Sequence, residues 1–286
     1  MPLSDLIRTL NSPSGSLPGH YARSGLDQPF VAVDGRVFLH YANLRLESHF
    51  LPIAETRSGK THGHAASLQV FGLSNRQPIA PEAVFVLPTD DAEFVYLDRL
   101  VRTLHALNYL TRPTRGNLLL QVHARHVMSV PADHGLAFEE ILRPCGVLPE
   151  QVTLEIDIEG VEDLAHLIKA VASYRSRGYG IAISHFGRRQ IDFGILRELQ
   201  PDIVKLDSLL VSSNRPSSNR SLKPIIEALH KLPAQVLVEG IATDAMRKGA
   251  SAWNIDLLQA HAPLRRLLDP VPVATAGNSP CLRSAA

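Results

Sequence analysis

Four short β-branched runs in the second half of the chain each end in a polar residue and are predicted to be strands. They cover residues 152–155, 181–185, 203–205 and 236–239. The amphipathic segments between and after them are predicted helices, over residues 161–177, 193–199, 222–231 and 243–249. Asp192 and Thr243 are the expected N-caps of the second and fourth of these helices. Strands that alternate with helices favour a parallel sheet with crossover connections.

An antiparallel hairpin is predicted to open the fold. Residues 48–53 and 63–71 have strand patterns and are joined by a short turn. Because such a turn is too short for a crossover, we expect the two strands to run antiparallel. Further along, residues 118–123 are predicted as a strand and 137–142 as a short helix ended by Pro144 and Gly146.

The clearest helical pattern lies between these strands, over residues 90–110. Its apolar residues recur at helical spacing, whereas Asp98, Arg99 and Arg102 lie elsewhere on the helical wheel. We expect these three charged residues to form a solvated face. A charged strip that faces a partner is the alternative.

The polar strand ends predict a polar pocket. If the strands close into a barrel, Glu155, Ser184, Lys205 and Glu239 all lie at carboxyl ends of strands. Barrels of this kind carry their sites on that face. The fold class predicted from the pattern is therefore an α/β barrel with a polar mouth.

The length of 286 residues suits one such barrel, because that fold commonly takes about 250 residues. Residues 1–35 are predicted to be a partly ordered N-terminal arm with one helical turn around Leu6–Leu10. The barrel is expected over residues 36–268, with a mobile polar loop at 212–221. Residues 269–286 are expected to be a disordered tail.

Charge and cysteine content narrow the class of protein. The net charge of +1 shows no basic excess, so nucleic acid is not an expected partner. Cys145 and Cys281 lie far apart and fit neither a disulfide framework nor a metal motif. The start of the chain lacks a signal pattern and no run is long enough for a membrane span. We therefore expect a cytoplasmic protein that does not insert into a membrane.

Eight stretches in a fixed order carry a resemblance to a known family. They are Phe50-Leu51-Pro52-Ile53, Ala65-Ala66-Ser67-Leu68-Gln69, Gln121-Val122-His123, Glu155-Ile156-Asp157-Ile158, Ser184-His185-Phe186-Gly187, Lys205-Leu206-Asp207, Glu239-Gly240-Ile241-Ala242 and Gln259-Ala260-His261. From about Phe38 to about Pro263 the chain resembles an EAL domain, the bacterial cyclic-di-GMP phosphodiesterase family. The resemblance implies a TIM-like (β/α)8 barrel of EAL type with one antiparallel strand.

The resemblance also implies where an active family member would hold its metals. Active members bind divalent cations with carboxylates and an asparagine, and they use a lysine as well. Here these ligand positions read Ala65, Gln121, Ser184 and His185. Two closely spaced cations need several anionic ligands, so we expect a degenerate site without catalysis and without a cofactor.

Several family positions are retained. Glu155, Lys205 and Glu239 match catalytic positions of the family and are interpreted as vestigial. We expect the two carboxylates to pair with Lys205 and hold the barrel mouth together. Gln259, Gln69 and Lys205 are the candidate ligand-binding residues by resemblance. Gln69 stands where the family has a phosphate-binding arginine and so lacks the charged fork.

Histidines offer a second hypothesis for the mouth. His123 and His185 with Glu155 make a His-His-carboxylate set of the kind that binds zinc or iron. The simpler interpretation is that both histidines are neutral fillers of a vacated metal site. The remaining histidines are expected to be surface or boundary residues, and they include His62, His64, His105 and His230.

Three functions remain open from the sequence. The leading hypothesis is a catalytically inactive EAL-like domain that regulates through an unidentified protein partner in cyclic-di-GMP-linked signalling. The second is a receptor that binds cyclic-di-GMP without cutting it, although the lost arginine makes this ligand doubtful. The third is an active phosphodiesterase with an altered metal site. A homodimer stays open.

Overall fold

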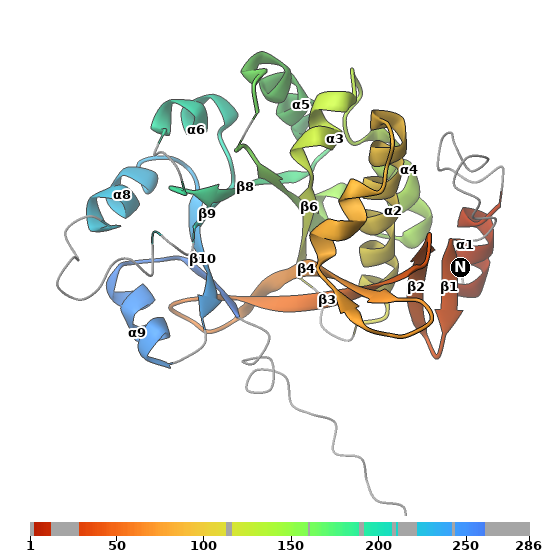
Figure 1. Ribbon diagram of the computed structural model, residues 1–286. Coiled ribbons are helices and arrows are strands. Elements are labelled where there is room, and N and C mark those ends of the chain that lie inside the picture. The colour runs from red at the N-terminus through yellow and green to blue at the C-terminus, as the bar shows by residue number, and fades with distance from the viewer. Residues whose placement is uncertain are drawn as a thin grey trace, which may run out of the picture.

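Eight strands close into a barrel through the pairing of β3 (Leu44–Glu55) with β4 (Thr61–Gly72) (Figure 1). The computed structural model describes residues 3–12, 29–112, 116–159, 161–188, 192–207, 210, 222–241 and 244–260. Within these residues the barrel order is β3-β11-β10-β9-β8-β7-β6-β4. The remaining barrel strands are β6 (Asn117–Val122), β7 (Val152–Asp157), β8 (Gly180–Phe186), β9 (Ile203–Leu206), β10 (Gln235–Ile241) and β11 (Leu257–Ala260).

One barrel strand runs against the others. β3 is antiparallel to both of its barrel neighbours, β4 and β11, while the pairs from β4 round to β11 are all parallel. The predicted antiparallel hairpin and the TIM-like (β/α)8 fold with one antiparallel strand are therefore confirmed. The parallel strands all point their carboxyl ends at the same mouth of the barrel.

Helices cover the outside of the barrel (Figure 1). The helices are α1 (Leu3–Leu10), α2 (Asp91–Leu110), α3 (Ala124–Ser129), α4 (Leu136–Cys145), α5 (Leu164–Ser176), α6 (Phe193–Leu199), α8 (Leu222–Leu229) and α9 (Asp244–Ala252), with 3-10 turns η1 (Pro81–Val86) and η2 (Pro149–Gln151). Figure 1 shows α5, α6, α8 and α9 ringing the barrel, while α2 and α4 lie together on the side near the N-terminus. No helix within the described ranges is long and apolar enough to cross a lipid bilayer.

Small and branched apolar side chains fill the barrel interior. The buried interior cluster consists of Ile53, Ala65, Leu119, Ala182, Ile203, Leu237 and Leu257. Ala65 belongs to this packed layer and is only 4% exposed. Its methyl group therefore contributes to the core at a position that faces the mouth.

The N-terminal segment is more structured than the single helical turn we predicted. Helix α1 buries Leu6, Ile7 and Leu10. Strand β1 (Phe30–Val33) pairs antiparallel with β2 (Arg36–Tyr41), which continues onto β3. The side chain of Asn11 donates to the carbonyl of Phe30 at 2.8 Å and accepts from its amide at 3.0 Å. A short strand β5 (Pro78–Ile79) extends the opposite edge beside β4.

The helix predicted over residues 90–110 is confirmed, because α2 covers Asp91–Leu110. Asp90 caps it by accepting from the amide of Glu93. The solvated face predicted for this helix is wrong at Asp98 and Arg102, which are 3% and 2% exposed. Helix α2 packs against β2, β3 and β6 as well as against α3 and α4. Because these contacts cover most of the surface of α2, Asp98 and Arg102 are buried and need partners of opposite charge.

Several helix bounds differ from the predicted ranges. Helix α4 continues through Pro144 to Cys145 and stops at Gly146, which has the left-handed φ of 69° that suits glycine. Helix α5 begins at Leu164 because Asp163 caps it.

Asp192 caps α6 as predicted, accepting from the amides of Gly194 and Ile195. The predicted cap Thr243, the predicted loop 212–221 and the predicted tail 269–286 lie outside the described residues.

Candidate functional site

Three charged side chains from neighbouring strands meet at the barrel mouth. Lys205 on β9 donates from Nζ to Glu155 Oε1 on β7 at 3.0 Å and lies 2.8 Å from Glu239 Oε2 on β10. The side chains of Lys205 and Glu155 are 8% and 9% exposed, and that of Glu239 is 28% exposed. The predicted pairing of both carboxylates with Lys205 is therefore present.

Electrostatics keep Lys205 charged. Burial alone would lower the pKa of Lys205, but the two adjacent carboxylates outweigh burial and raise it above its ordinary range. Lys205 is thus an ammonium at neutral pH and carries no free electron pair. It serves as an internal counter-ion that binds both carboxylates.

A cavity of about 690 Å³ opens above this cluster. Its lining includes the apolar side chains of Leu51, Leu68, Phe85, Phe94 and Val101. It also includes the charged cluster and polar side chains from β4, β6 and β11. The cavity is therefore amphipathic.

The wall beside α2 holds a buried ion network that the sequence analysis missed. Asp98 Oδ2 accepts from Arg102 Nη2 at 2.9 Å and lies 3.0 Å from His126 Nδ1. The other oxygen of Asp98 accepts from the amide of His123 at 3.4 Å. Burial alone would raise the pKa of Asp98, but Arg102 and His126 together hold it below its usual range. Asp98 therefore ties α2 to the start of α3.

His123 has a structural position at this wall. Its Nδ1 accepts from the amide of Arg125 and so caps α3. Its ring stacks on Phe85 at a centroid distance of 5.9 Å and meets the edge of Phe94 at 4.8 Å. Burial lowers the pKa of His123. A neutral aromatic role accounts for all of these contacts.

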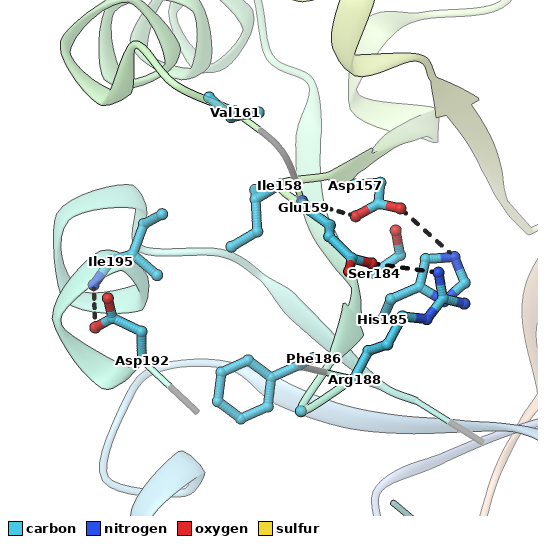
Figure 2. Close-up of a pocket in the computed structure, with 11 residues that line it drawn as sticks. Asp157, Ile158, Glu159, Val161, Ser184, His185, Phe186, Arg188, Asp192 and Ile195 are labelled. Carbon is cyan, nitrogen blue, oxygen red and sulfur yellow. Dashed lines mark hydrogen bonds and ion pairs between the residues drawn. The ribbon is translucent and has the colours of Figure 1, made fainter. Parts of the chain in front are cut away.

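His185 lines both this cavity and a second one of about 380 Å³, which Figure 2 shows. It has a left-handed φ of 54°. Arg188 Nη2 donates to its Nδ1 at 2.9 Å, and its Nε2 lies 3.9 Å from Asp157 Oδ2. Arg188 also bonds Asp207 at 2.9 Å and Glu159 at 3.4 Å. The Nδ1 of His185 also lies 3.3 Å from Asp207 Oδ2, so His185, Arg188 and Asp207 form one polar cluster.

Comparison with known proteins assigns the fold to a family. The sequence pattern of the EAL domain matches residues 38–259. The chain belongs to the EAL domain family.

The chain is 24% identical over 201 residues to the blue light- and temperature-regulated antirepressor BluF of Escherichia coli K12, covering 68% of this chain and 49% of BluF. It is also 32% identical over 115 residues to YkuI, an uncharacterized EAL-domain protein of Bacillus subtilis, covering 38% of this chain and 28% of YkuI. The chain thus spans about half the length of BluF and less than a third of YkuI.

Solved EAL structures have the same barrel. A standalone EAL protein of Vibrio cholerae O395 in its c-di-GMP-bound form superposes with a TM-score of 0.63 at 22% identity, covering 75% of this chain and 89% of that one. The Bacillus subtilis YkuI complex with c-di-GMP and calcium also gives 0.63, at 21% identity, with 75% and 53% covered. At these identities the likeness establishes the fold alone.

The EAL family positions for metal ligands do not supply a metal set here. Ala65 has no donor atom, and Ser184 offers only a neutral hydroxyl. Gln121 pairs with Glu155 in the register of β6 and β7 and lines the large cavity. Both Glu155 and Glu239 already pair with Lys205, so their combined charge is −1. The residues at this mouth do not fit a pair of divalent cations, which require several anionic ligands.

The alternative histidine metal set is not assembled either. Among the described residues, no group of three His, Cys, Asp or Glu side chains is placed to hold a metal ion. His123 caps α3, His185 accepts from Arg188, and Glu155 pairs with Lys205. The three side chains of the His123, Glu155 and His185 hypothesis therefore each make other contacts in the structure.

The ligand-binding residues predicted by resemblance separate in the structure. Gln259 is 5% exposed and lines the large cavity, and Lys205 lies in the charged cluster of the same cavity. Gln69 is exposed on β4, opposite Glu47 of β3, and is not among the residues that line the cavity. Of the three, only Gln259 and Lys205 are brought together at the mouth.

Two of the histidines predicted at the surface or boundary are core residues. His64 and His105 are 2% and 5% exposed. His105 Nδ1 makes a 2.9 Å hydrogen bond with Ser48 Oγ, and burial lowers its pKa to about 4. His105 is therefore neutral at physiological pH and lines the cavity beside α2.

Proposed function

We propose that this EAL domain does not hydrolyse cyclic-di-GMP and regulates through binding to another protein. The observation that carries the proposal is the internal cation at the mouth. Lys205 lies 3.0 Å from Glu155 and 2.8 Å from Glu239, so the chain itself already offsets half of the charge of the retained carboxylates. With Ala65 and Ser184 at two of the positions where the EAL resemblance implies anionic ligands, the one net negative charge of this cluster is too little to hold two metal ions.

The pattern of retention supports a regulatory role. The barrel core and the strand pairings are complete in the described residues, and Ala65, Gln121, Ser184 and His185 stand where the EAL resemblance implies metal ligands. A fold is stabilised by different residues from those that perform chemistry, so the scaffold can persist after activity is lost. The relative BluF is named a blue light- and temperature-regulated antirepressor.

A complementation experiment tests the proposal. A strain that lacks this protein is complemented with the wild type and with Glu155→Gln, which removes a carboxylate that any metal-dependent mechanism at this mouth would need. A protein that acts by binding a partner restores the transcriptional profile equally in both cases and leaves cellular cyclic-di-GMP unchanged. Rescue by the wild type alone, together with a fall in cyclic-di-GMP, would show that catalysis is the function.

A second candidate function is a cyclic-di-GMP receptor. The amphipathic cavity of about 690 Å³ and the retained Gln259 at its surface favour this candidate. The structural neighbours from Vibrio cholerae and Bacillus subtilis were solved with c-di-GMP. Isothermal titration of cyclic-di-GMP into the full chain, with and without calcium, decides between the two. Saturable binding at micromolar concentration identifies a receptor, and no detectable heat leaves the protein-binding role.

A further inference from the structure

The large mouth cavity has the charge and shape of a site for an organic cation. We propose that it binds a guanidinium or ammonium group carried on an aliphatic body. A free alkylamine or alkylguanidine has this chemistry, and so does an arginine or lysine side chain of another protein. The proposal rests on the cavity alone and holds whether or not the regulatory function is correct.

The charges around the cavity leave an excess of carboxylates. Glu155 and Glu239 share the single charge of Lys205. Glu82 on η1 is exposed at the rim, and no ion pair of its carboxylate is present within the described residues. Two negative charges therefore remain uncompensated at the surface of the cavity.

The other charged groups that line the cavity do not alter this balance. Asp98 is neutralised by Arg102 behind the wall, with 2.9 Å between Oδ2 and Nη2. Arg125 pairs with Asp91 at 2.8 Å. The field in the cavity therefore attracts a cation and repels an anion.

The aromatic wall suits the rest of such a ligand. Phe85 and Phe94 pack together at a centroid distance of 5.8 Å, and both line the cavity. The guanidinium of Arg125 already lies over the Phe94 ring, 4.6 Å from its centroid. Guanidinium groups stack favourably on aromatic faces, so this wall accepts the chemistry that we propose. At the rim, Val86 is 78% exposed and extends the apolar surface.

A buried polar group gives an independent indication of a ligand. Gln259 lines the same cavity and is only 5% exposed. Its side-chain carbonyl oxygen has no hydrogen-bond partner in the part of the chain that the structure describes. Buried acceptors without a partner are uncommon and call for an explanation. A ligand that donates hydrogen bonds, as guanidinium and ammonium groups do, satisfies this acceptor.

The test compares two probes that differ only in charge. Titration of n-butylguanidinium and its neutral isostere n-butylurea into the full chain, followed by NMR, isolates the contribution of the cation. We expect n-butylguanidinium to bind with a Kd on the order of 1 mM or tighter and n-butylurea at least about tenfold more weakly. The affinity for the cation should fall as salt is raised, because the attraction is screened. Equal binding of the two probes, or no binding of either, overturns the proposal.

Variants locate the site without disturbing the fold. Glu82→Gln removes an exposed, unpaired carboxylate and should weaken n-butylguanidinium binding about threefold or more, by loss of an attractive charge. Glu227→Gln on α8 removes a carboxylate that is 62% exposed and does not line the cavity, and it should leave the affinity unchanged. An identical affinity in Glu82→Gln and the wild type contradicts the proposed site.

A peptide pair distinguishes the two sources of the cation. Capped Leu-Arg is compared with capped Leu-citrulline, in which a neutral urea replaces the guanidinium. Preference for Leu-Arg, lost in Glu82→Gln, assigns the site to a side chain of a protein partner. Binding of n-butylguanidinium without any peptide preference assigns it to a free small cation. Each result supports the cation site and identifies a different occupant.

Discussion

Replacement of Lys205 by methionine should destabilise the protein strongly, because Lys205 neutralises a buried carboxylate. The side chain of Glu155 is 9% exposed and lies 3.0 Å from Nζ. Removal of one partner from a buried ion pair costs about 3–5 kcal/mol, because the other charge is left uncompensated. Glu239 is 28% exposed, so water solvates it and its contribution to the loss is smaller. For a chain of this size the loss corresponds to a fall in Tm of roughly 10 °C.

The assay is urea unfolding followed by circular dichroism, with two matched variants. Lys223→Met on α8 breaks a surface pair with Glu227, whose side chains are 72% and 62% exposed, and should cost less than about 1 kcal/mol. The double variant Lys205→Met/Glu155→Gln removes the uncompensated charge and should recover about 1–2 kcal/mol of the loss. A loss in Lys205→Met no larger than that in Lys223→Met would refute the counter-ion role.

The pH dependence supplies a second check on the same variant. The pKa of Lys205 is raised in the folded state. Its contribution to the free energy of unfolding is therefore complete below the unfolded-state pKa near 10.4, and it is lost only as the pH rises through the folded-state pKa. The full effect is therefore present at pH 8. At pH 5 the difference in the free energy of unfolding between Lys205→Met and the wild type should be smaller, because protonation of the uncompensated carboxylate in the variant removes its buried charge. A gap that is the same at both pH values contradicts this reasoning.

Three further variants probe the walls of the mouth. Asp98→Asn should lower the free energy of unfolding by about 3–5 kcal/mol in urea at pH 7. The folded pKa of Asp98 is lowered, so its contribution to stability is present above about pH 4. The difference in stability between variant and wild type should therefore shrink as the pH falls below that value. The pKa of His105 is about 4, so the free energy of unfolding of the wild type should fall by up to about 3 kcal/mol as the pH falls from about 6.5 to 4. In a pH series of unfolding curves, His105→Gln should lose less stability over the same range. His123→Ala removes the cap of α3 and should lower stability by about 1 kcal/mol or more by the same assay, whereas an unchanged midpoint would contradict its capping role.

The barrel and the charged cluster were predictable from sequence because they depend on local pattern. β-branched runs that end in polar residues identify strands and their carboxyl ends, and a closed parallel barrel brings those ends to one mouth. This reasoning placed Glu155, Lys205 and Glu239 together, and the structure has Lys205 in contact with both carboxylates.

The buried network on α2 was not predicted, because helical periodicity assigns charged residues to solvent. Helix α2 is packed by strands on one side and by α3 and α4 on the other, and this packing depends on residues distant in sequence. The one available signal was the i,i+4 spacing of Asp98 and Arg102, which permits an internal pair. The strand at Phe30–Val33 was missed for a similar reason, since its partner β2 supplies the pairing that its short pattern lacks.

The central claim, that the mouth holds its own cation in place of catalytic metals, is tested most directly by a turnover measurement. Purified full-length chain is incubated with cyclic-di-GMP and either Mg²⁺ or Mn²⁺, and the linear dinucleotide product is followed by chromatography beside Glu155→Gln as the control. We predict no product above the control with either metal. Metal-dependent product that Glu155→Gln abolishes would contradict the account and establish a phosphodiesterase.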